Sequence, residues 1–132
     1  MVKGIGHIAV LAANLGETVQ RYQELLGVSP GEVKTMPEAG VKVAVLDVGG
    51  ATRLEVLEPL PGSNLEKVLK ERGEGMHHIC FDVDDIEGEL KRLADMGVNL
   101  IDRKARRGLE GRVAFIHPRA TGGVLIELCQ RY

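Results

Sequence analysis

Residues 75–85 read GMHHICFDVDD, and this segment decides the fold because the chain carries a similar one near its start. Residues 4–14 read GIGHIAVLAAN, so the pattern Gly-x-x-His-Ile occurs twice. It places His7 in the first copy and His78 in the second, 71 residues later. Self-similarity of this kind indicates a duplicated supersecondary unit.

The ends of the two halves also match. Residues 54–57 read LEVL and residues 126–129 read IELC, so Glu55 in the first half corresponds to Glu127 in the second. Each half therefore carries one His near its start and one Glu near its end. A site built symmetrically between the two copies is the first arrangement that such a repeat predicts.

The composition is that of one compact domain. The chain has 132 residues, of which 44% are hydrophobic, so it is long enough for one core and too short for two independent domains. A net charge of −2 argues against general nucleic-acid binding, and the absence of Trp argues against a stacking platform. The N-terminus lacks signal-peptide features and no stretch has membrane-spanning length. We therefore expect a cytoplasmic protein in which Cys80 and Cys129 are reduced, buried thiols and do not form a disulfide.

The first module, about residues 1–61, is predicted to have the order β-α-β-β-β. Asn14 and Glu17 have the spacing of a capping box, and the helix that they begin should end at Gly27. The Gly49-Gly50 dipeptide is suited to a tight hairpin. The predicted strands are residues 2–10, 32–36, 41–48 and 52–57.

A connector helix, about residues 63–72, precedes a second module of the same order at about residues 75–132. Its helix should be capped by Asp84 or Asp85 and end at Gly97. The predicted strands are residues 76–83, 98–103, 112–117 and 124–129. The fold class is therefore α+β, with two tandem βαβββ modules in one domain covering residues 1–132.

Four polar side chains share strand faces with apolar neighbours. A buried carboxylate is costly unless it is paired or bound to a metal, so one shared cation explains the set most simply. The set is His7, Glu55, His78 and Glu127. Taken singly, a His on such a face is usually a satisfied core residue, and Glu55 could be a solvated residue of an edge strand. The matched recurrence favours the metal site.

Two other histidines are not expected to be ligands. His77 lies on the opposite strand face from His78 and should be structural or face solvent. His117 ends a predicted strand before Pro118. Two imidazoles and two carboxylates leave two positions of an octahedral shell open, which suits Co²⁺, Mn²⁺, Ni²⁺, Fe²⁺ or Zn²⁺.

The segments GMHHICFDVDDI at residues 75–86 and HPRATGGVLIEL at residues 117–128 resemble the methylmalonyl-CoA epimerase family of the vicinal oxygen chelate (glyoxalase/bleomycin resistance) superfamily. The resemblance covers essentially the whole chain. It implies a curved, open, eight-stranded mixed sheet around one divalent metal per chain, with Co²⁺ favoured. The implied ligands are His7, Glu55, His78 and Glu127. Many members of the family have Gln in place of Glu55, and some have an acid/base glutamate in place of Val43.

The same resemblance implies epimerisation of methylmalonyl-CoA by proton transfer at the carbon α to the thioester, through an enolate that the metal stabilises. Because Val43 cannot carry a proton, we assign Glu127 as the base and Glu55 as its partner. The resemblance also implies an acyl-CoA substrate and a homodimer. The basic residues Arg103, Lys104, Arg106, Arg107 and Arg112 could hold the phosphates of coenzyme A or form an ordinary solvated loop.

Two other classes of protein remain open at this point. One is another metal-dependent enzyme of the same scaffold, such as a lactoylglutathione lyase or a ring-cleaving dioxygenase. The other is a non-catalytic, drug-sequestering binding protein. Such a binder has no need of four metal ligands, so the His/Glu set argues against it.

Overall fold

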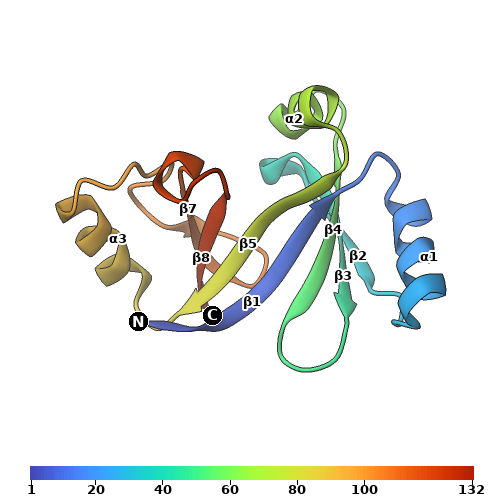
Figure 1. Ribbon diagram of the computed structural model, residues 1–132, viewed down its shortest axis with the longest axis horizontal. Helices are drawn as coiled ribbons and strands as arrows, with labels where there is room; N and C mark the ends of the chain where they lie inside the picture. The colour runs from blue at the N-terminus through green and yellow to red at the C-terminus, as the bar shows by residue number, and fades with distance from the viewer. The chain divides into compact units, whose positions relative to one another are not determined.

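The computed structural model describes residues 1–132 and divides the chain into two compact units (Figure 1). Ile8–His77 form one, here called the 8–77 unit. Met1–His7 and His78–Tyr132 form the other, here called the 78–132 unit. These boundaries differ from the modules at about 1–61 and 75–132, because the first residues of the chain group with its C-terminal half. Strands β1 (Val2–Leu11) and β5 (Gly75–Val83) each contribute residues to both units.

The 8–77 unit contains a sheet in the order β2-β3-β4-β1, in which β3 is antiparallel to both β2 and β4. Its own helices are α1 and α2, and a short 3₁₀ helix, η1, separates β2 from β3. The elements are α1 (Leu15–Leu26), β2 (Glu32–Met36), η1 (Pro37–Ala39), β3 (Val41–Asp47), β4 (Arg53–Pro59) and α2 (Asn64–Arg72).

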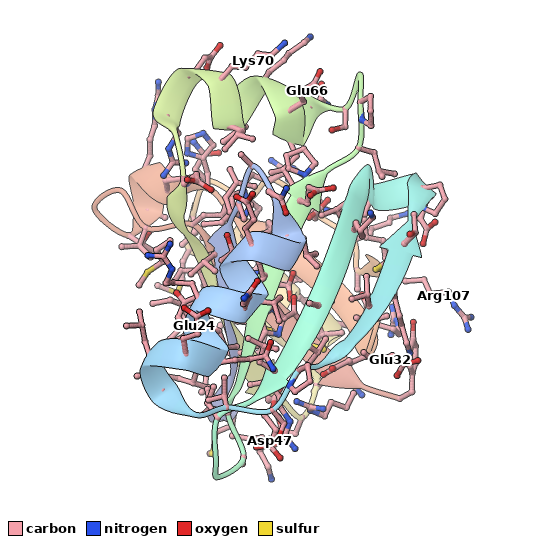
Figure 2. All side chains as sticks on the ribbon, turned by 90° about the vertical axis from the view of Figure 1, so that its right-hand side faces the viewer. Glu24, Glu32, Asp47, Glu66, Lys70 and Arg107 are labelled. Atoms are coloured by element: carbon pink, nitrogen blue, oxygen red, sulfur yellow. The ribbon has the colours of Figure 1, made fainter.

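Helix α1 begins and ends where the sequence predicts. The Asn14 side chain accepts a hydrogen bond from the Glu17 backbone N–H, and Gly27 ends the helix in the left-handed conformation that a residue without Cβ adopts readily. Figure 2 shows the helix lying across β4 and β3. Its apolar face forms one buried cluster with both strands, which contains Ala12, Leu15, Val19, Ala44, Leu46 and Val56.

The 78–132 unit repeats this plan. Its strands are hydrogen-bonded in the order β1-β5-β8-β7-β6, with β5 parallel to β8 and β7 antiparallel to both of its neighbours. The remaining elements are α3 (Ile86–Asp95), β6 (Arg106–Arg107), β7 (Gly111–Ile116), the 3₁₀ helix η2 (Pro118–Ala120) and β8 (Ile126–Arg131). Helix α3 packs on its strands through Val83, Ile86, Leu90, Ala114, Ile116 and Leu128.

The two units use the same device to fix the start of their helices on the sheet. The Glu58 carboxylate accepts a hydrogen bond from the Leu15 N–H in one unit, and the Gln130 side-chain oxygen accepts one from the Ile86 N–H in the other, both at 2.8 Å. Each acceptor lies three residues after Glu55 or Glu127. A single strand thus carries both the glutamate and the anchor of its helix.

Two local predictions were wrong. The strand expected at residues 98–103 is absent: one bridge joins Leu100 to Ile116, and the regular pairing is confined to β6. The reason is that the N–H groups of Ile101 and Asp102 both donate to the Phe115 carbonyl, while the Asp102 carboxylate accepts from the Phe115 N–H. A side chain thus replaces a backbone partner, and the chain bends away from the sheet.

The hairpin between β3 and β4 is also longer than predicted. Asp47 pairs with Arg53, so that residues 48–52 form the loop. Gly49 and Gly50 have φ values of 91° and 68°, respectively, which L side chains rarely adopt. The dipeptide marks the turn correctly, but the turn contains more residues than Gly49-Gly50.

The hydrogen-bonded order of all eight strands is β2-β3-β4-β1-β5-β8-β7-β6. They form a mixed sheet, as expected. Both cysteines are buried and free, which confirms the prediction for them. None of the helices has the length and apolar character needed to cross a membrane.

Leu46→Ala tests the core of the 8–77 unit. Leu46 is fully buried in the cluster beneath α1, so we expect the free energy of unfolding to fall by about 2–5 kcal/mol. The measurement is equilibrium denaturation in urea. The matched control is Leu26→Ala, because Leu26 is 64% exposed and the same truncation there should change stability by less than about 0.5 kcal/mol. Equal losses in the two variants would contradict the assigned core.

Candidate metal centre

Three side chains of the 78–132 unit converge within contact distance. His7 lies on β1, His78 on β5 and Glu127 on β8. The two Nε2 atoms are 3.1 Å apart, His7 Nε2 is 3.4 Å from Glu127 Oε1, and His78 Nε2 is 3.7 Å from Glu127 Oε2. The exposed fractions of the three residues are only 8%, 4% and 8%, respectively. The repeat therefore places at least these three predicted residues in one buried cluster.

Strand alternation explains why these polar groups share a face. Val83 and Leu128 pack against α3, so residues of odd number on β5 and even number on β8 face the helix. His78 and Glu127 consequently point to the opposite face. The Phe115 ring of β7 stands edge-to-face with the His78 imidazole, at 5.4 Å between centroids, and helps to fix its orientation.

The spacing of the donor atoms fits a divalent metal. With metal–ligand bonds of about 2.1 Å, neighbouring ligand atoms lie about 3.0 Å apart in an octahedral shell and about 3.4 Å apart in a tetrahedral one. Two of the three separations, 3.1 and 3.4 Å, fall in this range, and the third, 3.7 Å, lies slightly above it. Two imidazole nitrogens and a carboxylate are also ligands that first-row divalent ions accept.

Burial shifts the pKa values of the cluster in opposite directions. Desolvation lowers the pKa of His7 to about 4, because the positive imidazolium is the form that loses water. Desolvation also raises the pKa of Glu127 to about 7, because the negative carboxylate is the form penalised there. At neutral pH the His7 ring is thus neutral, with a lone pair available to a cation. Glu127 is balanced between its two protonation states.

Cys80 adds a neighbour that sequence reasoning treated only as a buried, reduced thiol. Its thiol hydrogen-bonds the Glu127 carboxylate, and one ligand atom from each of His7, Cys80 and Glu127 lies within 4.8 Å of the other two. The sequence shows only that Cys80 shares a strand face with His78, because it lies two residues after that histidine.

Glu55 belongs to the 8–77 unit and is described there by itself. It lies on β4 opposite Val45 of β3 and is 6% exposed. Its neighbour Val56 packs against α1, so Glu55 points to the sheet face away from that helix. The alternative of a solvated residue on an edge strand is wrong, since β4 lies between β3 and β1. Its role as a metal ligand stays a prediction.

The other two histidines have structural surroundings. His117 accepts a hydrogen bond from the Arg119 N–H through Nδ1 at 3.1 Å and so caps η2. His77 is half-buried, and burial, with a smaller contribution from Arg72, lowers its pKa. Neither histidine belongs to a group of side chains that lie close enough together to hold a metal ion.

The basic loop is largely engaged in contacts of its own. Arg106 forms an ion pair with Asp102 and lies over the Phe115 ring, and Arg112 pairs with Glu87. Arg107 lies over the Tyr132 ring. An anionic ligand bound by these arginines would have to compete with existing partners.

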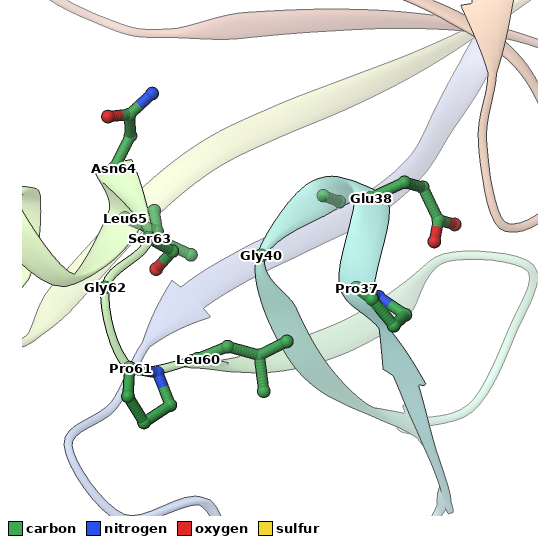
Figure 3. Close-up of a pocket in the computed structure, with 10 residues that line it drawn as sticks. Pro37, Glu38, Gly40, Leu60, Pro61, Gly62, Ser63, Asn64 and Leu65 are labelled. Atoms are coloured by element: carbon green, nitrogen blue, oxygen red, sulfur yellow. The ribbon is translucent and has the colours of Figure 1, made fainter.

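A carboxylate that sequence reasoning passed over lines a cavity of the 8–77 unit. Val43, whose side chain is apolar, is buried in the sheet. Glu38 of η1, by contrast, lies at the rim of a cavity of about 460 Å³. Figure 3 shows it with the apolar lining residues Leu60 and Pro61. Glu38 follows Pro37 in a short turn between two strands, a position at which functional side chains are common.

Comparison with known proteins places the chain in a family. Residues 6–115 match the family described as the Glyoxalase/Bleomycin resistance protein/Dioxygenase superfamily. The mitochondrial methylmalonyl-CoA epimerase of Bos taurus is 36% identical over 129 residues, which cover 96% of this chain and 73% of that protein.

Solved structures agree with the fold. The methylmalonyl-CoA epimerase of Mycobacterium tuberculosis superposes with a TM-score of 0.92 at 34% identity, covering 99% of this chain and 89% of that one. A methylmalonyl-CoA epimerase solved in complex with methylmalonyl-CoA and NH4+ gives a TM-score of 0.90 at 34% identity and covers 99% and 96%, respectively. These matches confirm the expected α+β fold class. The chain therefore belongs to the methylmalonyl-CoA epimerase family of the glyoxalase/bleomycin resistance protein/dioxygenase superfamily.

Proposed function

We propose that this protein is an isomerase that epimerises methylmalonyl-CoA at the carbon α to the thioester. The observation that carries the proposal is the buried cluster of His7, His78 and Glu127, in a chain that matches an epimerase solved with methylmalonyl-CoA over 99% of its length. The test is exchange of the α-proton of methylmalonyl-CoA in deuterated water, followed by NMR. The proposal would be refuted if the protein exchanged no α-proton whichever divalent metal was supplied.

The proposed ligands of one divalent metal per chain are His7, Glu55, His78 and Glu127, with Co²⁺ favoured and Mn²⁺, Ni²⁺, Fe²⁺ or Zn²⁺ as alternatives. Support comes from the spacing of the three donors in the 78–132 unit and from the burial of Glu55. When bound, the metal would act as a Lewis acid that lowers the cost of negative charge on the substrate carbonyl oxygen.

Glu127 is the proposed base. A general base works best when its pKa lies near the working pH, and burial raises the pKa of Glu127 to about 7. It can therefore take the α-proton and later release it at neutral pH. Epimerisation requires the proton to return to the opposite face of the enolate, and Glu55 is the proposed partner for that step.

Glu38 is an alternative partner. A cation lowers the basicity of a carboxylate that binds it, so a carboxylate outside the ligand set keeps more of its affinity for a proton. Glu38 is outside the proposed set and lines the cavity of the 8–77 unit. Its lining is otherwise made of neutral side chains and glycines, which makes Glu38 the one carboxylate there.

Other enzymes of the superfamily remain rivals for the activity. A lactoylglutathione lyase would act on a glutathione adduct, and a ring-cleaving dioxygenase would consume oxygen with a catechol. Both substrates should be inert if the proposal holds. A non-catalytic binder is disfavoured by the buried His/Glu cluster, because a protein that only sequesters a ligand has no need of it.

We further propose that the protein is a cytoplasmic homodimer that binds neither nucleic acid nor membranes. An open sheet leaves edge strands whose backbone groups need cover, and self-association is a common way to provide it. Sedimentation equilibrium at micromolar concentration should therefore give twice the chain mass of 14.3 kDa.

The metal-site assignment is tested with His78→Ala. Loss of an imidazole ligand should reduce metal affinity by at least about 100-fold and remove measurable epimerisation. Metal content after dialysis is the direct measurement. The control is His117→Asn, which keeps a side-chain acceptor for the Arg119 N–H and lies outside the cluster, so it should retain the metal. Full occupancy in His78→Ala would overturn the assignment.

The pKa of Glu127 predicts how metal affinity depends on pH. Below pH 7 its carboxyl is protonated and a cation must displace that proton, so the apparent association constant should rise about tenfold per pH unit up to pH 7 and then level off. His7, with a pKa of about 4, adds a second proton only at still lower pH. Competition with a chelator from about pH 5.5 to 8 measures this slope. Glu127→Gln should flatten it, and a flat profile in the unmodified protein would contradict the assigned pKa.

Single Glu→Gln variants separate the proton-transfer roles, because an amide oxygen can still bind a metal but an amide cannot accept the proton. Glu127→Gln should reduce α-proton exchange by about 10²–10⁴-fold. Replacing the true partner, which is Glu55 or Glu38, should leave α-proton exchange of one epimer intact. The same replacement should block conversion of that epimer to the other. Metal content of each variant is the control. Unchanged interconversion in all three variants would exclude all three residues.

A further inference from the structure

Two thiols and a carboxylate outside the proposed ligand set form a second cluster in the 78–132 unit. Cys80 and Asp82 lie on β5 and Cys129 on β8, and one ligand atom from each lies within 4.8 Å of the other two. The thiols are buried and hydrogen-bonded to one another. Val113 forms one buried cluster with the two cysteines on the sheet face opposite α3.

The parallel register of β5 and β8 brings these groups together. Cys80 lies opposite Glu127, and Asp82 lies opposite Cys129. Residues two apart share a strand face, so Asp82, Cys80 and His78 follow one another along β5, while Cys129 follows Glu127 along β8. Cys80 therefore shares a row of the sheet with Glu127, and Cys129 shares the next row on that face with Asp82.

The Asp82 carboxylate is held in place from two sides. Its Oδ2 accepts a hydrogen bond from Arg131 Nε at 3.2 Å. A Cβ at Gly6 would lie 2.5 Å from Oδ1, so any side chain at residue 6 of β1 would require this carboxylate to move. The Asp82 side chain is 24% exposed, so solvent reaches this carboxylate, whereas both thiols are buried.

The donor type differs from that of the His/Glu cluster. Thiolates are soft ligands that select Zn²⁺ and similar ions, whereas imidazole and carboxylate donors accept a wider range of first-row metals. Two sulfurs and one carboxylate give three ligands of a tetrahedral shell, and water can supply the fourth. Binding requires that each thiol lose its proton to solvent, so two protons are released per ion.

We propose that Cys80, Asp82 and Cys129 form a second cation site, for a thiophilic divalent ion such as Zn²⁺ or Cd²⁺, distinct from the His/Glu ligands. The site shares a border with those ligands, because Cys80 also lies within 4.8 Å of ligand atoms of His7 and Glu127. An ion held at the thiols would take Cys80 away from its hydrogen bond to Glu127 and place a positive charge beside that carboxylate.

Titration of the Co²⁺-loaded protein with Cd²⁺ tests the proposal through the ultraviolet charge-transfer band of cadmium thiolates. The chain has only two cysteines, so any such band must come from Cys80 or Cys129. We expect the band to saturate at one Cd²⁺ per chain and to be displaced by Zn²⁺. Cys80→Ser and Cys129→Ser should each lose about half of its intensity. Asp82→Asn should keep the full intensity and weaken Cd²⁺ affinity by about tenfold.

His78→Ala separates this site from the proposed function. If the sites are distinct, this variant keeps the thiolate band while losing its Co²⁺ and its proton exchange. Circular dichroism verifies that each variant is folded. The proposal is overturned if the folded, unmodified protein gives no band, if Asp82→Asn binds Cd²⁺ as tightly as the unmodified protein, or if His78→Ala removes the band.

Discussion

The burial of a carboxylate beside two imidazoles is the constraint on which the arrangement of the 78–132 unit depends. Glu127 is 8% exposed, and a buried carboxylate costs several kcal/mol unless it is protonated, hydrogen-bonded or bound to a cation. Strand β5 supplies the Cys80 thiol as a hydrogen-bond partner for Glu127, and the His7 imidazole stays neutral. Without a cation the carboxyl therefore spends much of its time protonated. The affinity for a metal arises from the same burial, because a divalent charge compensates the carboxylate more fully than a proton does.

The duplicated helix anchors explain how each sheet can present polar groups on one face. Glu58 and Gln130 bind the first N–H group of α1 and α3, respectively, and thereby fix which face of each sheet the helix covers. Once α1 and α3 bury residues such as Val56 and Leu128, strand alternation leaves Glu55 and Glu127 on the other face. A one-residue shift in either strand would send the glutamate into the helix interface. The anchor and the glutamate are only three residues apart, so they cannot shift independently.

Much of the fold and of the His/Glu cluster could be predicted from the sequence, because the repeat shows each main feature twice. Asn14 and Gly27 bound the first helix as expected, and His7, His78 and Glu127 meet in one cluster. The strand expected at residues 98–103 could not be excluded from its apolar pattern, since the decisive bond, from the Phe115 N–H to Asp102, joins residues of distant segments. For the same reason no local pattern shows that Cys80 contacts Glu127 across β5 and β8, or that Gly6 makes room for Asp82.

The proposed chemistry places two opposing demands on Glu127. As a ligand it should be ionised and bound to a cation, which lowers its affinity for a proton. As a base it should have a pKa near neutrality, and burial alone supplies that by raising the pKa to about 7. A carboxylate cannot meet both demands in the same step. The conflict does not arise for the second proton transfer if that step belongs to a carboxylate that never binds the metal. Val43 cannot provide one, whereas Glu38, at the rim of an otherwise uncharged cavity, can.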